Sequence, residues 1–264
     1  MTAWPGGARG ALSLSFDNLG EAAELELGAE PGAPLGEHFT ATRVLPRLLA
    51  ALREHDVAAT FFVEGLNTEL YPRSLEAIAA DGHEVAYHAW RHEQWGELSA
   101  AEQAENLDRG IAAFEALGLS VAGFRPPGGQ LGAGGIEVLR EAGLRYCSPE
   151  GRVVTAEHDV AVLPFQWRHV DAACVLPPMS AAREEMAGSP DPLDAGAFLA
   201  YLEAELAQLA ADGGFATVIL HPFMLDWLGE DRLGALLDLL GKARKEKRLW
   251  VAPCAEVAGH VPAA

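Results

Sequence analysis

Six side chains suited to hydrolytic chemistry stand at or just after the ends of short apolar runs: Asp17, Asn18, His88, His92, Arg125 and His221. A carboxylate at such a place can act as a general base, and an imidazole can bind a metal ion or transfer a proton. His88 and His92 are four residues apart, a spacing that places both rings on one face of a helical turn, where they can share one ion. The spacing alone is a weak signal, and its position after an apolar run is what favours a site.

The two other basic side chains of this set stand in stiff surroundings. Arg125 begins the run Arg-Pro-Pro-Gly-Gly, in which prolines fix the backbone and glycines permit a close approach or a positive φ. An arginine held in this way makes a fixed partner for a carboxylate. His221 ends the apolar run 216–220 and precedes Pro222, a position that suits a structural histidine as well as a general acid or base.

A regular alternation of strands and helices is needed to bring these residues together. Apolar runs predict strands at 11–16, 58–63, 84–87, 122–124, 146–148, 160–163, 216–220 and 249–252, and helical periodicity predicts helices at 41–54, 71–81, 99–117, 134–142, 195–211 and 230–246. Ser99 and Glu102 form a capping box, and Asp194 is a good N-cap. Seven or eight βα units in 264 residues predict an α/β fold of the barrel type, with its active site at the carboxyl ends of the strands. We expect one domain over residues 1–264, with its core at about 11–260.

Two long segments interrupt the alternation. Residues 19–37 follow the first strand and are rich in Glu, Gly and Pro, and residues 164–193 contain Trp167 and Asp171. Long loops in a compact domain are usually functional or disordered. We expect both segments at the mouth of the barrel, and the alternative is ordinary surface insertion.

The order of these motifs resembles that of the polysaccharide deacetylase family, also called the NodB-homology family or carbohydrate esterase family four. The motifs are the strand-end Asp-Asn at 17–18, the HxxxH at 88–92, the RxPxG at 125–129 and the Leu-His at 220–221. The likeness runs from about residue 11 to residue 260 and includes the sequence that connects the motifs. The tail Leu-His-Pro-Phe at 220–223 and the lack of a recognisable export signal resemble the cytosolic peptidoglycan-deacetylase/allantoinase-like branch.

The resemblance implies a NodB-like, distorted (β/α) barrel of about seven units. It also implies one divalent metal ion, which we expect to be zinc, although cobalt or nickel could replace it. The ligands would be His88 and His92, with Asn18 at the position of the family's third ligand.

The resemblance also implies roles for the remaining residues. Asp17 would be the catalytic base, Arg125 would hold that base, and His221 would be the general acid. Residues implied in contacts with the substrate are Leu220 in an acyl pocket, Pro127, Trp167 and Asp171.

The sequence departs from the family pattern at three places. The second Asp of the first motif, a metal ligand in the family, is Asn18, and an amide oxygen lacks the charge of a carboxylate. Ala and Trp stand at 89–90, where relatives often have Ser or Thr after the first histidine. The family's fourth motif, an Asp-Trp-containing stretch, has no clean match. Trp167 and Asp171 are nearest to it, and Asp171 could orient or charge-stabilise His221 or serve an ordinary loop.

Composition excludes several classes of partner. The chain has 38 acidic and 19 basic side chains and a formal charge of −19, which argues against binding to nucleic acid. Three scattered cysteines, Cys147, Cys174 and Cys254, predict buried free thiols and neither a disulfide framework nor a cysteine zinc site. No apolar run reaches the roughly 20 residues that cross a bilayer. We therefore expect a cytoplasmic protein without a membrane partner.

The sequence thus favours a metal-dependent hydrolase of carbon–nitrogen bonds, acting as a deacetylase of an N-acetylated sugar or a related small N-acyl substrate. One alternative is an allantoinase-like hydrolase of another linear or cyclic amide. The other is a metal-poor pseudoenzyme that binds carbohydrate, for which Asn18 is the support. The sequence leaves open the exact substrate, whether that substrate is a small molecule or an oligosaccharide, and the oligomeric state of the protein.

Overall fold

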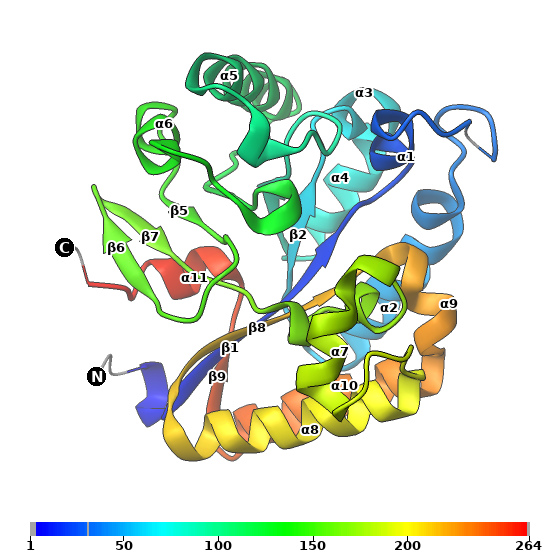
Figure 1. The fold of residues 1–264 in the computed structure, drawn as a ribbon, viewed down its shortest axis with the longest axis vertical. Coiled ribbons are helices and arrows are strands. Elements are labelled where there is room, and N and C mark those ends of the chain that lie inside the picture. The colour runs from blue at the N-terminus through cyan, green and yellow to red at the C-terminus, as the bar shows by residue number, and fades with distance from the viewer. Residues whose placement is uncertain (1–3, 31, 263–264) are drawn as a thin grey trace.

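The centre of the molecule is a curled, mainly parallel sheet, seen here in a computed structural model that describes residues 4–30 and 32–262 (Figure 1). Its strands are β1 (Gly10–Asp17), β2 (Thr60–Val63), β3 (Glu84–Tyr87), β4 (Gly123–Phe124), β5 (Tyr146–Cys147), β6 (Thr155–Glu157), β7 (Val160–Val162), β8 (Gly214–Leu220) and β9 (Leu249–Val251). The strand order is β6-β7-β5-β4-β3-β2-β1-β8, and β9 also pairs with β1. The predicted distorted (β/α) barrel is therefore confirmed.

Helices surround this sheet (Figure 1). They are α1 (Ala22–Glu26), α2 (Leu45–Glu54), α3 (Asn67–Leu70), α4 (Pro72–Ala80), α5 (Ala100–Ala116), α6 (Gly135–Glu141), α7 (Ser180–Ala187), α8 (Ala195–Asp212), α9 (Leu225–Leu228), α10 (Glu230–Lys245) and α11 (Cys254–Ala258). Both expected caps form: Ser99 and Glu102 make a capping box, and Asp194 accepts from the first turn of α8. The long helices place apolar side chains in the main hydrophobic core, as α2 does with Leu45, Leu48, Leu49 and Leu52.

Strand register brings the candidate residues to one edge of the sheet. Asp17 pairs with Phe62, and Val63 pairs with Tyr87. Tyr87 pairs in turn with Phe124. Because all these pairs are parallel, residues that directly follow β2, β3 and β4 lie beside Asp17 at the carboxyl edge.

The barrel is not closed by a continuous ladder. β6 pairs antiparallel with β7 at one end of the sheet, and β8 lies at the other. Within the described residues, an isolated bridge between Val170 and Ile219 links the segment after β7 to β8. That bridge brings the long segment 164–193 to the end of β8, just before His221.

The structure adds short elements that hydrophobic periodicity did not predict. Strand β6 and the helices α1, α3, α7, α9 and α11 have between three and eight residues each. Two of them, α1 and α7, lie in the long segments that were expected to be loops. Elements this short contain too few repeats for a periodic pattern to stand out, so packing against the barrel decides them.

Two further expectations concern composition. Cys147, Cys174 and Cys254 are all buried free thiols, as predicted. Over residues 4–30 and 32–262, no helix is both long and apolar enough to cross a membrane.

Candidate active site

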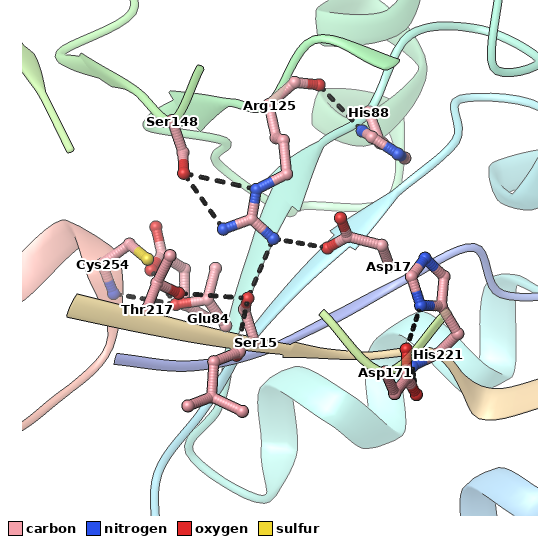
Figure 2. A network of polar contacts seen from close by, with 12 residues as sticks. Ser15, Asp17, Glu84, His88, Arg125, Ser148, Asp171, Thr217, His221 and Cys254 are labelled. Atoms are coloured by element: carbon pink, nitrogen blue, oxygen red, sulfur yellow. Dashed lines mark hydrogen bonds and ion pairs between the residues drawn. The ribbon is translucent and has the colours of Figure 1, made fainter. Parts of the chain in front are cut away.

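A buried ion pair joins the first and third motifs. Asp17, the last residue of β1, accepts a hydrogen bond from Arg125 Nη1 at Oδ1, with 2.6 Å between the two atoms. Both side chains are almost completely buried. Arg125 also donates from Nη1 to Ser15 Oγ at 2.8 Å and from Nη2 to Ser148 Oγ at 3.0 Å. The predicted contact between Arg125 and Asp17 is thus present in the structure (Figure 2).

Two aromatic rings pack against the guanidinium of Arg125, which binds Asp17. Its Cζ atom lies 3.9 Å from the ring centre of Phe62 and 5.6 Å from that of Phe165. Arginine stacks on aromatic faces through its delocalised charge. Contacts with these rings and with the hydroxyls fix the arginine, and through it the carboxylate.

A second buried carboxylate holds His221, the residue that follows β8. Asp171 Oδ1 accepts from His221 Nδ1 at 2.6 Å, and Asp171 Oδ2 accepts from the His221 backbone N–H at 2.8 Å. Since a carboxylate only accepts, Nδ1 carries a hydrogen and Nε2 is the nitrogen that faces the site. Burial lowers the pKa of His221, but the charge and hydrogen bond of Asp171 and the charge of Asp17 outweigh it, so the pKa is raised. His221 therefore tends to hold a proton.

The two histidines of the HxxxH motif approach each other, with 5.0 Å between their ring centres. The expectation that they share a face of a helical turn is wrong. Residues 88–92 form a bend in which Ala89 has φ 63° and His92 has φ 74°, values that belong to the left-handed region. Non-glycine residues there cost about 1–3 kcal/mol each and persist where the surroundings hold them.

The donor set fits a divalent ion. His88 Nδ1 donates to the Arg125 carbonyl at 2.8 Å, which leaves Nε2 as a free acceptor. Burial, followed by repulsion from His92, lowers the pKa of His88 well below its ordinary value. Burial, followed by repulsion from His221, also lowers the pKa of His92. Neutral imidazoles are the form that binds metal.

Asn18 supplies a further observation on this fit. Its backbone has φ 61°, and its side-chain Oδ1 is buried without a hydrogen-bond partner. A buried oxygen without a partner costs free energy, and a cation would satisfy it. Across the described part of the chain, no group of three or more His, Cys, Asp or Glu residues could hold a metal. A site here would therefore use two imidazoles and this amide.

Four ionisable side chains of the site affect one another's pKa: those of Asp17, His88, His92 and His221. The charge of Asp17 favours the protonated forms of His92 and His221, while the charge of His221 disfavours the protonated forms of His88 and His92. For His92, burial is the largest cause, and its pKa is lowered overall. Figure 2 shows Asp17 with His88 on one side and His221 on the other. This grouping puts a carboxylate, a proton-bearing imidazole and a metal-binding pair around one space.

The expected substrate contacts need correction. Leu220 has no exposed surface and packs in the main hydrophobic core, and Pro127 is also buried. Asp171 is fully buried and uses both oxygens on His221. These three side chains offer no surface to a substrate in this structure. Trp167 is half-buried and lines a cavity of about 350 Å³ with Pro178, Met179 and neighbouring polar residues.

Sequence reasoning missed two polar residues beside the site. Ser148 follows β5 and holds Arg125, as described above. Glu64 follows β2, is fully buried, and accepts from Asn67 Nδ2 at 3.0 Å, while its Oε1 has no partner. Burial, with repulsion from Asp17 as a further cause, raises the pKa of Glu64 well above its ordinary value. The signal that could have found both is their place directly after a strand.

Comparison with known proteins identifies the family. Residues 11–147 match the family model for polysaccharide deacetylases, which is more than half of the chain. The chain belongs to the polysaccharide deacetylase family. A peptidoglycan-N-acetylglucosamine deacetylase of Bacillus cereus is 30% identical over 120 residues, which are 45% of this chain and 41% of that protein. The chain spans less than half the length of the curated relatives that it matches here.

Solved structures share the deacetylase fold over almost the whole chain. A putative polysaccharide deacetylase from Mycobacterium smegmatis has a TM-score of 0.82 and 27% identity, and the match covers 98% of this chain and 92% of that one. The PuuE allantoinase has a TM-score of 0.75 and 20% identity, with the same coverage of both chains. The second likeness shows the fold alone.

Proposed function

We propose that this chain is a metal-dependent hydrolase of carbon–nitrogen bonds that deacetylates an N-acetylated sugar or a related small N-acyl substrate. The observation that carries the proposal is the pairing of Asp17 with Arg125 beside the pairing of His221 with Asp171, with His88 on the other side of Asp17 from His221. Such a site has a base and an acid that are each oriented by a buried partner of opposite charge. Membership of the deacetylase family supports this reading.

Asp17 acts as the base in this proposal. Its carboxylate accepts a proton from a water molecule, whose oxygen then bonds to the acyl carbon. Arg125 occupies Oδ1 with a fixed hydrogen bond, which leaves Oδ2 for the proton. Because the arginine is held by Ser15 and Ser148, the carboxylate needs no reorganisation as the proton moves.

His221 acts as the acid. Its Nε2 proton goes to the leaving nitrogen as the carbon–nitrogen bond breaks, giving a carboxylic acid and a free amine. The raised pKa of His221, which Asp171 maintains against burial, keeps that proton available. Asp17 and His221 then exchange protons with solvent and return to their starting states.

His88, His92 and Asn18 would hold the metal. The free Nε2 of His88, the lowered pKa of both histidines and the partnerless Oδ1 of Asn18 support this assignment. When bound, a divalent ion acidifies water and polarises the acyl carbonyl. Imidazole ligands favour zinc, with cobalt or nickel as replacements.

Residues outside the chemistry would contact the rest of the substrate. Trp167 is the candidate with exposed surface, and it stands in a cavity with room for part of a sugar ring. We also propose that residues 1–264 form one domain with its core at about 11–260. The pairing of β9 with β1 supports this, because it brings the end of the chain onto its beginning.

The proposal is tested with a panel of N-acetylated sugars, their oligomers and cyclic ureides, assayed with zinc, cobalt or nickel. We expect acetate release from an N-acetylated sugar, its loss by a factor of at least about 10² in Asp17→Asn and in His221→Ala, and loss of bound metal in His88→Ala. Turnover of cyclic ureides alone would favour the allantoinase-like alternative. No turnover with a filled metal site, or retained turnover in Asp17→Asn, would refute the proposed mechanism.

A further inference from the structure

The bend that carries His88 and His92 contains unusual backbone for its residue types. Ala89 and His92 both have positive φ, 63° and 74°. Since neither residue is glycine, this conformation needs contacts from outside the bend to maintain it. The two imidazoles can keep a common geometry only as long as those contacts hold.

The backbone of the bend is hydrogen-bonded to the segment that follows β2. The N–H of Gly65 donates to the Ala89 carbonyl at 2.9 Å, and the N–H of Leu66 donates to the Trp90 carbonyl at 2.9 Å. The bonded carbonyls belong to two consecutive residues between the histidines. The bend is therefore placed relative to β2 as well as to its own strand.

Trp90 fills the space between this segment and α5. Its side chain is 5% exposed, and its ring centre lies 3.5 Å from the guanidinium carbon of Arg109 on α5. A Cβ added at Gly65 would lie 2.5 Å from Cε3 and 3.0 Å from Cζ3 of the same ring. The indole is thus seated directly against a glycine backbone, with no space for a methyl group.

Further contacts hold the ends of the bend. The N–H of His88 donates to the Val63 carbonyl at 3.0 Å, and His88 Nδ1 donates to the Arg125 carbonyl at 2.8 Å. Arg91 forms an ion pair with Glu26 of α1 at 3.0 Å, with side chains 45% and 29% exposed. Ion pairs exposed to this degree contribute little to stability. The seat formed by Trp90 on Gly65, with Arg109 against the indole, is a buried side-chain contact that supports the residues between the two histidines.

We propose that Trp90 is a positioning residue for metal binding: its indole, seated on Gly65 and covered by Arg109, fixes the left-handed bend that aims His88 and His92 at one ion. The inference rests on the proposed function, because it needs these histidines to bind metal. It assigns to Trp90 a role in affinity for the ion that is separate from its contribution to the hydrophobic core. Gly65 is part of this proposal because only a residue without a side chain leaves space for the indole ring at this position.

Two substitutions disturb the seat without touching a ligand. Gly65→Ala adds a methyl group where the ring lies, so the indole and the attached bend must move. Trp90→Leu removes the stacked ring and leaves a cavity. In the double variant Gly65→Ala/Trp90→Leu the indole atoms are gone and Tyr87 Cε2, 3.2 Å from the added Cβ, is the close contact that remains, so the added methyl group should cost less affinity than it does beside Trp90.

The experiment measures the dissociation constant for zinc by competition with a chromogenic chelator, and the visible absorption of the cobalt-loaded protein. Gly65→Ala and Trp90→Leu should each weaken zinc binding by about 10- to 100-fold, the usual effect of losing a residue that orients a metal ligand. Their cobalt spectra should differ from that of the wild type. Gly234→Ala on α10, where a Cβ would meet nothing within 4 Å, is the matched glycine control.

A second control separates positioning from general loss of stability. Leu237→Ala removes a fully buried side chain of α10 and should lower the melting temperature while it leaves the zinc constant unchanged. Wild-type zinc affinity and cobalt spectrum in both Gly65→Ala and Trp90→Leu would overturn the inference and leave the proposed function intact. Absence of metal binding by the wild-type chain would overturn both. If Gly65→Ala does not fold, Trp90→Leu and Arg109→Gln carry the same comparison.

Discussion

Replacing Arg125 with methionine tests whether the centre of the site is a true buried ion pair. The substitution keeps most of the side-chain volume but removes the guanidinium, whose side chain is 1% exposed, from an Asp17 carboxylate that is 6% exposed. It also removes the donors to Ser15 and Ser148. Breaking a buried pair by deleting one partner costs about 3–5 kcal/mol, because the remaining charge is left uncompensated.

This cost converts into a measurable change in melting temperature. At roughly 2.1 cal/mol/K per residue, 264 residues have an unfolding entropy of about 0.55 kcal/mol/K, so the loss lowers Tm by about 5–9 °C. Calorimetry and urea unfolding of wild type and Arg125→Met provide the measurement. The control is Arg47→Met, which removes an arginine from exposed pairs with Asp226 and Glu230 and should cost below about 1 kcal/mol.

A double substitution isolates the charge. In Asp17→Asn/Arg125→Met no uncompensated carboxylate remains, so it should be more stable than Arg125→Met, with a coupling free energy of about 0.5–3 kcal/mol. If Arg125→Met costs no more than Arg47→Met, or if Asp17→Asn recovers none of the loss, the reasoning about this pair is refuted. Arg125→Met and Asp17→Asn should each lack turnover in any case, because the first removes the side chain that orients the proposed base and the second removes the base itself.

Three further predictions concern the groups around this pair. Asp171→Asn removes the charge that raises the pKa of His221 while burial remains, so the alkaline limb of the kcat–pH profile should move to lower pH; an unchanged limb would contradict the assignment of His221 as the acid. Glu64, whose folded-state pKa is raised above 4.5 mainly by burial, makes the protein lose stability as pH rises from 4.5 through that raised value. Glu64→Gln should therefore gain stability over the wild type between pH 5 and pH 8 in urea unfolding, and a gain that does not grow with pH would contradict it. Asn18→Asp should tighten zinc binding because a carboxylate adds charge to the ligand set, and chelator competition would show an unchanged constant if this side chain does not bind the ion.

Local patterns in the sequence determined the regular elements and the order of the site. The strand at Glu84–Tyr87 was predicted at its observed bounds, and the caps at Ser99 and Asp194 are present. These features depend on residues within a few positions of one another, so the sequence displays them directly. Because parallel strand ends share an edge, the same patterns also indicated which polar residues would meet.

Contacts between distant segments decided the rest. Asp171 contacts His221, which is 50 residues away in the sequence. The sequence of the long segment 164–193 did not distinguish Asp171 from an ordinary loop residue. Leu220 lies in the core with no exposed surface, which the Leu-His motif by itself did not indicate. The bend at His88 and His92 has left-handed backbone and is hydrogen-bonded to the segment that follows β2, whereas a four-residue spacing alone suggested a helical turn.

The sequence by itself thus determined the longer helices, the strands other than β6 and the chemical types at the strand ends, since these follow from periodicity and side-chain chemistry. Tertiary structure alone decided which charges are buried together, which nitrogen of His88 is free, and why Glu64 favours its neutral form. The physical reason is that burial and pKa depend on every segment packed around a group, and these segments come from all parts of the chain.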